Sequence, residues 1–336
     1  MATIVLVSMV AAAGVSAAKP VVNSAGPSIV GAPVVGAPAS CWDGGQYWNV
    51  AQGAADVHGN TIYWQTPALG AAWTALSPGT NPTVVAIGPG NVVILGTTGG
   101  VIWAKETVNY GASWTNVVLP TIAVKAGTGP TAVFLAATPE LDVFYVAPAG
   151  NLMVATLNLG TASTSSQNIG GNVFATPAAT ATSTSSAVVV VKGTGGTIYE
   201  LPVAMGGPGL WTKFHDGTIG AGASLSSDAS NVFLTVSGQN SRLYMAWSDD
   251  GGVTWVTNFQ QGLVPLNTHA LYWANLGGVV TSAPSSAVTI PGSGYAEPLV
   301  RGSDGRIWDA GVTVPTPGVV PVFLITNVWT GPYAGP

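Results

Sequence analysis

Two adjacent aspartates lie in the octapeptide SDDGGVTW, residues 248–255, where a serine, glycines and a tryptophan flank them. Carboxylates in such a loop could transfer protons or bind calcium, but a calcium loop needs several more oxygen ligands in one segment. The Asp250 carboxylate can instead accept backbone N–H groups of its own turn, as Asx turns do. Gly252 permits an unusual φ, and Trp255 can bury about 200 Å² between neighbouring sheets. We therefore predict a structural turn built on Ser248, Asp250, Gly252 and Trp255.

The remaining titratable residues form no recognisable catalytic or metal motif. Glycoside hydrolysis usually requires two facing carboxylates, and Glu106 and Glu200 each lack an evident acidic partner in the sequence. The three histidines are far apart, and Cys41 is the only cysteine, which excludes an internal disulfide and a cysteine-based metal centre. The segments GTTGG and GTGG lie in predicted hairpin turns rather than between a strand and a helix. We therefore predict no phosphate site, no metal, no cofactor and no catalytic residue.

The composition predicts many short strands. Charged residues make up 6% of the 336 residues, against about 25% in ordinary soluble domains, while 45 residues are Gly and 24 are Pro. β-Branched residues and turn formers favour an all-β fold. The formal net charge is −5 with only eight Lys and Arg residues, and they form no cationic run, which argues against a nucleic-acid partner.

Six strand–turn–strand units recur along the chain. Each has an apolar strand, a turn containing Gly or Asn, and an aliphatic residue followed by an aromatic residue or Met. Gly and Asn supply the positive φ angles of tight turns, so each unit is predicted to be a β-hairpin. The aliphatic positions are Ile62, Ile102, Leu152, Ile198, Leu243 and Ile307.

Another strand-forming segment precedes most hairpins. In four of them a tryptophan follows the aromatic residue by ten to twelve positions, at Trp73, Trp114, Trp211 and Trp255. Four strands in each repeat of about 40 to 50 residues are typical of a propeller blade. We therefore predict an all-β fold, a β-propeller of six four-stranded antiparallel blades. Residues 261–278 are extra material, and the alternative is that they form a seventh, degenerate blade or a long insertion.

The octapeptide has two relatives at the same place in other repeats. TPALGAAW, residues 66–73, keeps only the threonine, the glycine and the tryptophan. TVNYGASW keeps the whole pattern with an amide in place of the acid, through Thr107, Asn109, Gly111 and Trp114. The pattern resembles the Asp-box of sialidase-like β-propellers, in which the motif is a scaffold element on the rim. Sialidases also carry an arginine triad, whereas this chain has three arginines in all, two of them in one hairpin turn. The resemblance therefore implies a propeller of this superfamily without the enzyme activity.

Glycan binding without chemistry is the second functional hypothesis. The segment LVRGSDGRIWDA, residues 299–310, resembles the repeat of bacterial and fungal propeller lectins. In such lectins sugars lie between blades or in hollows of the blade faces, where aromatic rings stack on apolar sugar faces and a few polar groups fix the orientation. Some tryptophans fall outside the recurring position after a hairpin, which we call the phased position. Four of these are the candidate ligand-binding residues: Trp48, Trp64, Trp247 and Trp273.

The N-terminal part of the chain differs from the rest. The first 18 residues resemble a secretory signal but lack a charged n-region, and their apolar run is short for a transmembrane helix. We predict an extended arm over residues 1–39 that lies against a neighbouring protein subunit, and a propeller domain over residues 40–336. A cleaved signal over residues 1–18 is the alternative.

The composition has little charge and much Ala, Gly, Thr, Ser and Val. In this it resembles the compositions of virion decoration, tail or fibre proteins and of secreted surface proteins. Together these features predict a non-enzymatic β-propeller displayed on a virion or on an extracellular cell surface. It would serve adhesion or decoration through glycan recognition. The alternatives are a structural assembly protein with no ligand and a sialidase-like glycoside hydrolase.

Overall fold

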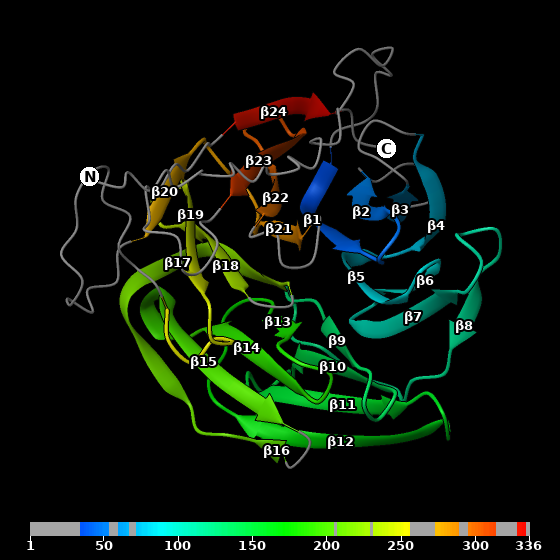
Figure 1. Ribbon diagram of the computed structural model, residues 1–336. Coiled ribbons are helices and arrows are strands. Elements are labelled where there is room, and N and C mark those ends of the chain that lie inside the picture. Colours follow the sequence, from blue (N-terminus) through cyan, green and yellow to red (C-terminus); the bar gives the residue numbers. More distant parts are fainter. Residues whose placement is uncertain are drawn as a thin grey trace, which may run out of the picture.

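A computed structural model of the chain describes residues 34–53, 60–66, 72–204, 207–228, 231–255, 273–288, 295–313 and 328–333. This part of the chain consists of β-strands and turns, with one short 3-10 element, η1 (Thr194–Gly196), and no α-helix. It therefore contains no helix long and apolar enough to cross a membrane. Its strands form six four-stranded antiparallel blades around a central axis (Figure 1).

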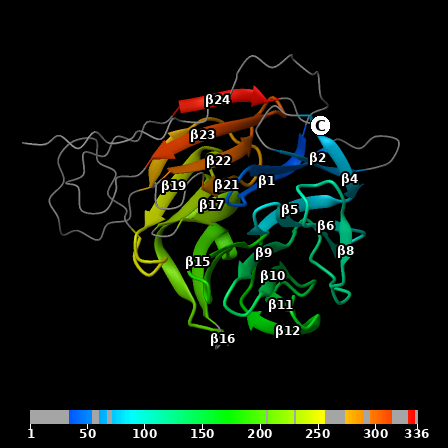
Figure 2. The same ribbon diagram turned by 45° about the vertical axis from the view of Figure 1, so that its right-hand side comes forward.

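In each of the first three blades the strands follow the chain order from the axis outward, as Figures 1 and 2 show. The first blade contains β1 (Val34–Trp42), β2 (Tyr47–Gly53), β3 (Thr61–Gln65) and β4 (Thr74–Pro78). The second contains β5 (Thr80–Gly88), β6 (Asn91–Thr98), β7 (Val101–Thr107) and β8 (Thr115–Val117). The third contains β9 (Thr131–Leu135), β10 (Glu140–Val146), β11 (Leu152–Asn158) and β12 (Ser163–Gly170).

The fourth and fifth blades share one long strand, β17 (Thr212–Ser227). Its first part pairs with β15 as the outermost strand of the fourth blade, and its second part pairs with β18 as the innermost strand of the fifth. The fourth blade also contains β13 (Ala178–Ala181), β14 (Ser186–Lys192), β15 (Thr197–Ala204) and the short β16 (Gly207–Pro208). The fifth contains β18 (Val232–Gly238), β19 (Leu243–Ser248) and β20 (Ala274–Gly277). The sixth contains β21 (Ser285–Val288), β22 (Tyr295–Arg301), β23 (Ile307–Thr313) and β24 (Val328–Tyr333).

The innermost strands contact one another in a closed cycle, from β1 through β5, β9, β13, β17 and β21 back to β1. Buried apolar side chains fill each of the six junctions that the described residues form between blades. Between the first and second blades, Ile62 packs in one cluster with Ile94. Between the sixth and the first, Val34 packs in one cluster with Ile307 and donates its N–H to the Gly305 carbonyl at 3.0 Å. The ring is thus closed by contacts between two complete blades.

The six predicted hairpins each join the second and third strands of a blade. Their aliphatic residues lie at the start of the third strand and are at most 5% exposed: Ile62, Ile102, Leu152, Ile198, Leu243 and Ile307. Burial between blades explains why an aliphatic residue recurs there. The prediction of an all-β propeller with six blades is confirmed.

The phased tryptophans lie between the third and fourth strands and pack into the junction with the preceding blade. Trp114 packs between the first and second blades, and Trp211 packs between the third and fourth. The third blade has no tryptophan at this place, and Leu159 packs at its junction with the second blade instead. Large apolar side chains therefore hold neighbouring sheets together at the rim.

Backbone hydrogen bonds repeat where the chain passes from one blade to the next. Val124 donates its N–H to Gly100 O in a turn of the preceding blade (2.9 Å), and Lys125 donates to Val146 O in the following blade (2.8 Å). Two other links make the same two kinds of bond, Val173 with Phe174 and Val280 with Thr281. Each link is therefore held between two blades, beside the turns that join second and third strands.

Two boundaries differ from the prediction. β1 begins at Val34, inside the segment 1–39 assigned to the arm, because a bulged strand accommodates Gly36 at φ 79°. A Gly- and Pro-rich sequence suggested a linker there. The end of the extra segment 261–278 forms β20, the outermost strand of the fifth blade. The rest of that segment up to residue 272, and residues 1–33, lie outside the described residues.

Candidate ligand site

The turn after β19 is held together by the side chains of Ser248 and Asp250. The buried Ser248 hydroxyl donates to Asp250 Oδ1 (2.7 Å) and accepts the backbone N–H of Gly252 (2.8 Å). Asp250 Oδ1 also accepts the N–H of Thr254 (2.8 Å), and Oδ2 accepts the Thr254 hydroxyl (2.5 Å). Burial works against ionisation, but the hydrogen bonds from Thr254 and Ser248 lower the pKa of Asp250. Both carboxylate oxygens are thus engaged within the turn.

The turn after β7 repeats this arrangement with neutral side chains. Thr107 Oγ1 donates to Asn109 Oδ1 (2.9 Å) and accepts the N–H of Gly111 (2.9 Å). Asn109 Oδ1 in turn accepts the N–H of Ser113 (3.0 Å). The geometry of the octapeptide therefore does not depend on a negative charge.

Glu200, a candidate acid for glycoside hydrolysis, lies between the fourth and fifth blades and is 7% exposed. Burial raises the pKa of Glu200 to about 7, the hydrogen bond from Trp255 opposes that rise, and the nearby Asp250 charge adds to it. Hydrolysis needs two carboxylates that reach a substrate. Glu200 is covered and Asp250 is engaged in its turn, so this pair is poorly placed for that chemistry.

Of the four tryptophans predicted to bind a ligand, Trp48 and Trp247 lie in the core, and Trp64 and Trp273 are half-buried. Trp48 has no exposed surface and Trp247 is 5% exposed, so neither presents a ring face to a ligand in this structure. Trp64 stacks on Trp48 with ring centroids 5.4 Å apart. The ring centroids of Trp273 and Phe214 are 6.4 Å apart. Trp273 directly precedes β20, just as other tryptophans directly precede β4, β8 and β17. It therefore occupies the phased position. Neighbouring blades cover both faces of each sheet, which explains these burials.

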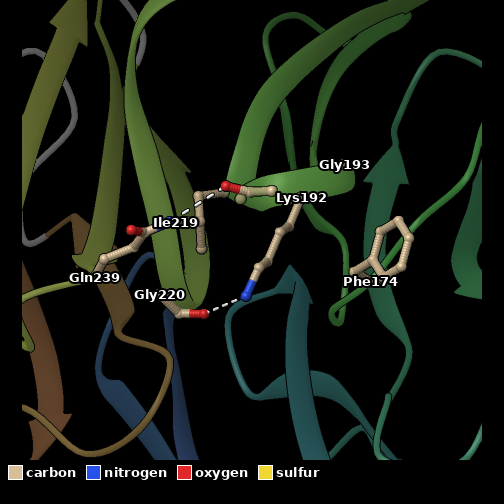
Figure 3. Close-up of a pocket in the computed structure, with 8 residues that line it drawn as sticks. Phe174, Lys192, Gly193, Ile219, Gly220 and Gln239 are labelled. Atoms are coloured by element: carbon tan, nitrogen blue, oxygen red, sulfur yellow. Dashed lines mark hydrogen bonds between the residues drawn. The ribbon is translucent and has the colours of Figure 1, made fainter.

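An open pocket of about 520 Å³ lies where the fourth blade meets the fifth (Figure 3). Its walls are the turn between β14 and β15, the crossing part of β17, the turn after β18 and the link that enters the fourth blade. Its lining residues are Phe174, Lys192, Ile219, Gln239 and the glycines 193, 195, 196 and 220. The volume is in the range of small-molecule sites, roughly 300–1,000 Å³.

The polar groups of the pocket are few and well placed. The Lys192 ammonium donates to the Gly220 carbonyl, and Gln239 Nε2 donates to Gly195 O at 3.2 Å. In Figure 3 the ring of Phe174 lies on the other side of Lys192 from Gln239. An ammonium has three N–H donors, so two donors of Lys192 can serve a ligand.

Phe174 supplies the aromatic surface of this site. Its side chain is 45% exposed, although most large apolar residues of the described chain are buried. A second cation, Lys125 Nζ, lies 4.9 Å from the centroid of the Phe174 ring and donates to Val173 O at 3.0 Å. The pocket therefore combines an exposed ring, two nearby ammonium groups and an amide.

Sequence reasoning missed these residues. The segment GTGG, residues 193–196, forms the hairpin turn that the sequence predicts, and its glycines also line the pocket. Phe174 and Lys192 belong to no motif. Only their position beside a blade junction gives them a common site.

No family model and no curated protein matches the chain. Solved structures do match it. A lectin of Aleuria aurantia in complex with α-methyl-L-fucoside matches with a TM-score of 0.60 at 12% identity, over 90% of this chain and 97% of the lectin. SapL1 lectin in complex with α-methyl fucoside matches with a TM-score of 0.64 at 10% identity, over 91% and 99%. BP39L lectin of Burkholderia pseudomallei matches with a TM-score of 0.59 at 17% identity, over 89% and 84%.

The fold of these relatives agrees with the blade count. Another structure of the Aleuria aurantia lectin, which matches at 12% identity with a TM-score of 0.60, is described as a six-bladed β-propeller. The chain therefore shares the six-bladed propeller fold with lectins of low sequence similarity.

Proposed function

We propose that this chain is a non-enzymatic β-propeller that binds glycans. The observation that carries the proposal is the pocket between the fourth and fifth blades, where the exposed ring of Phe174 lies with Lys192 and Gln239. Aromatic rings stack on the apolar faces of sugars, and a few polar groups fix the orientation of the hydroxyls. Two of the similar lectins were solved with a bound fucoside, which supports glycan recognition by this fold.

Direct binding measurements test the proposal. We expect a glycan array to identify ligands for the chain, and titration calorimetry to show that Phe174→Ala weakens binding about three- to tenfold through loss of stacking. Leu210→Ala is the matched control, because Leu210 is a large apolar residue in the same blade that is 86% exposed and lies outside the pocket. Absence of binding across all sugar classes would contradict glycan recognition and favour a purely structural assembly protein.

The catalytic alternative has its own test. Reporter glycosides, including sialosides, should show no turnover above buffer. Turnover that Glu200→Gln abolishes would show that the chain is a hydrolase.

We also propose that the turns at 248–255 and 107–114 are Asp-box elements, and that the chain belongs to the sialidase-like propeller superfamily. The matching side-chain hydrogen bonds of the two turns support this. So does the packing of Trp114 and Trp255 into the junctions with the preceding blades. In this assignment Ser248, Asp250, Gly252 and their counterparts are scaffold residues.

We propose further that the chain is displayed on a virion or extracellular cell surface, where it serves adhesion or decoration and its N-terminal arm binds a neighbouring subunit. Many copies on one surface would give avidity to weak single contacts. Deletion of residues 1–33 tests the arm, because it stops before β1 and keeps the first blade whole. The shortened chain should fold and bind glycans yet be lost from the particle or cell-wall fraction. Retention in that fraction would show that the arm is not the anchor.

A further inference from the structure

We infer that the pocket between the fourth and fifth blades selects saccharides that carry a carboxylate, and that the Lys192 ammonium binds this carboxylate. The inference rests on the proposed glycan-binding function and adds the chemical class of the ligand.

The charge of the pocket is the first argument. Among the described residues that line the pocket, Lys192 is the only ionisable side chain, and the others are apolar, amide or glycine. The chain as a whole has a net charge of −5 and only eight cationic residues. A carboxylate that approaches most of this surface meets few cations, so an ammonium without an acidic neighbour in the pocket wall is a distinctive feature.

The position of the ammonium is the second argument. One of its donors is used by the Gly220 carbonyl, which fixes the lysine against the crossing part of β17. A side chain that is already held loses less conformational freedom when it binds a ligand. Its other donors can form charge-assisted hydrogen bonds, which are about twice as strong as neutral ones.

The surroundings of Phe174 are the third argument. The Lys125 ammonium lies 4.9 Å from the ring centroid, so a second positive charge stands at the edge of the site. A pyranose stacked on Phe174 would therefore have two cations near it, Lys192 in the pocket and Lys125 beside the ring, and no acidic residue among the described lining residues. A dianionic phosphate would need more donors than the two remaining donors of Lys192, so a monoanionic carboxylate fits this site better.

Pairs of sugars that differ only in the acid group test the inference. Titration calorimetry would compare methyl α-D-glucuronide with methyl α-D-glucoside, and the methyl glycoside of N-acetylneuraminic acid with its methyl ester. We expect the acidic member of at least one pair to bind five- to tenfold more tightly, with the preference falling between 50 and 300 mM salt. The two pairs distinguish uronic from sialic acids as the source of the carboxylate.

Variants assign the effect to Lys192. Lys192→Gln should abolish the preference, so that the acidic and neutral members of each pair bind with equal affinity, and Lys192→Arg should retain it. Lys213→Gln is the matched control, because Lys213 is an exposed lysine on β17 outside the pocket. Circular dichroism checks that each variant is folded. If Lys192→Gln fails to fold, the salt dependence of the wild-type preference and Lys192→Arg decide the question.

The outcomes separate this inference from the proposed function. Equal affinity for the acidic and neutral members of both pairs would overturn the carboxylate assignment and leave glycan binding standing. An equal loss in Lys192→Gln and Lys213→Gln would also overturn it, since only general electrostatics would then be at work. Failure to bind any sugar, charged or neutral, would instead overturn the proposed function.

Discussion

Trp255 Nε1 donates a hydrogen bond of 2.8 Å to Glu200 Oε2 across the junction of the fourth and fifth blades. Glu200 belongs to β15, and Trp255 closes the turn after β19. The carboxyl group is buried, and its pKa is raised to about 7. One titratable group thus lies at the contact that joins two blades.

This contact predicts a pH dependence of stability between pH 4.5 and 8. The folded-state pKa of Glu200, about 7, lies above the ordinary value of 4.5, so the folded chain holds this proton more tightly than the unfolded chain. The resulting stability is fully present below pH 4.5 and is lost as the pH rises through about 7. The difference corresponds to at most about 3 kcal/mol. We expect Glu200→Gln to be more stable than the wild type at pH 8 and little changed at pH 4.5 in urea unfolding.

A matched variant checks the assignment. Glu106→Gln changes a partly exposed glutamate on the third strand of another blade and should leave the pH profile as it is. Parallel profiles for the wild type and Glu200→Gln between pH 5 and 8 would show that another group titrates there.

Asp43 ties the first blade to the second. Its carboxylate accepts the N–H groups of Gly45 and Gln46 (both 2.8 Å), the indole N–H of Trp48 (2.8 Å) and the N–H of Gly90 (2.9 Å). Burial opposes ionisation, but these bonds, first of all that from Trp48, lower the pKa of Asp43. The stability that the ionised Asp43 contributes is therefore fully present above pH 3.8, the ordinary pKa of an aspartate. It is lost as the pH falls through the lower pKa of Asp43 in the folded chain.

Asp43→Asn should destabilise the chain at pH 7 by about 2–4 kcal/mol, because the new NH₂ group faces donors and leaves some of them unpaired. Asp304→Asn is the control, since Asp304 is an exposed turn residue that accepts the N–H of Arg306 at 3.0 Å. Thermal unfolding measures both variants. If Asp43→Asn lost no more stability than Asp304→Asn, the four hydrogen bonds to Asp43 would contribute little to stability.

The sequence predicted those parts of the fold that depend on local patterns. A Gly-containing turn followed by an aliphatic residue defines each hairpin, so Ile62 and its five counterparts marked the blades correctly. The hydrogen bonds of the octapeptide also lie within seven residues of one another. Such features need no knowledge of the rest of the chain.

The candidate pocket could not be predicted in this way. Phe174 comes from a link between blades, Lys192 from the end of β14 and Gln239 from the turn after β18, and only the ring places them around one space. The burial of Trp48 and Trp247 has the same origin. In a propeller both faces of a blade are covered by neighbours, and these two rings pack between blades.

Gln65 predicts a stabilising substitution. It is 1% exposed, and neither its side-chain oxygen nor its nitrogen has a hydrogen-bond partner among the residues that the structure describes. Leu201, three residues after Ile198, holds the position in the fourth blade that Gln65 holds three residues after Ile62 in the first. A buried unpaired amide costs about 1–3 kcal/mol, so Gln65→Leu should raise the free energy of unfolding by about 1 kcal/mol or more.

Gln167→Leu is the control for this substitution, because Gln167 is exposed on β12 and should show almost no change. Chemical denaturation of the two variants gives the comparison. A destabilised Gln65→Leu chain would indicate that the amide is satisfied by water between the sixth and first blades.

Two glycines that both have a positive φ should differ sharply when replaced by alanine. Gly111 lies at φ 84° and Gly99 at φ 60°, so both substitutions carry a backbone strain of about 1 kcal/mol. A Cβ on Gly111 would clash with Trp64 Cη2, whereas a Cβ on Gly99 meets no atom of the described residues within 4 Å. Trp64 is fixed by Trp114, whose ring centroid is 5.6 Å away, so we expect Gly111→Ala to cost about 1–3 kcal/mol more than Gly99→Ala in urea unfolding. In a Trp64→Phe background the clashing atom is gone and the two costs should converge; costs that stay apart there would place the strain elsewhere in the turn.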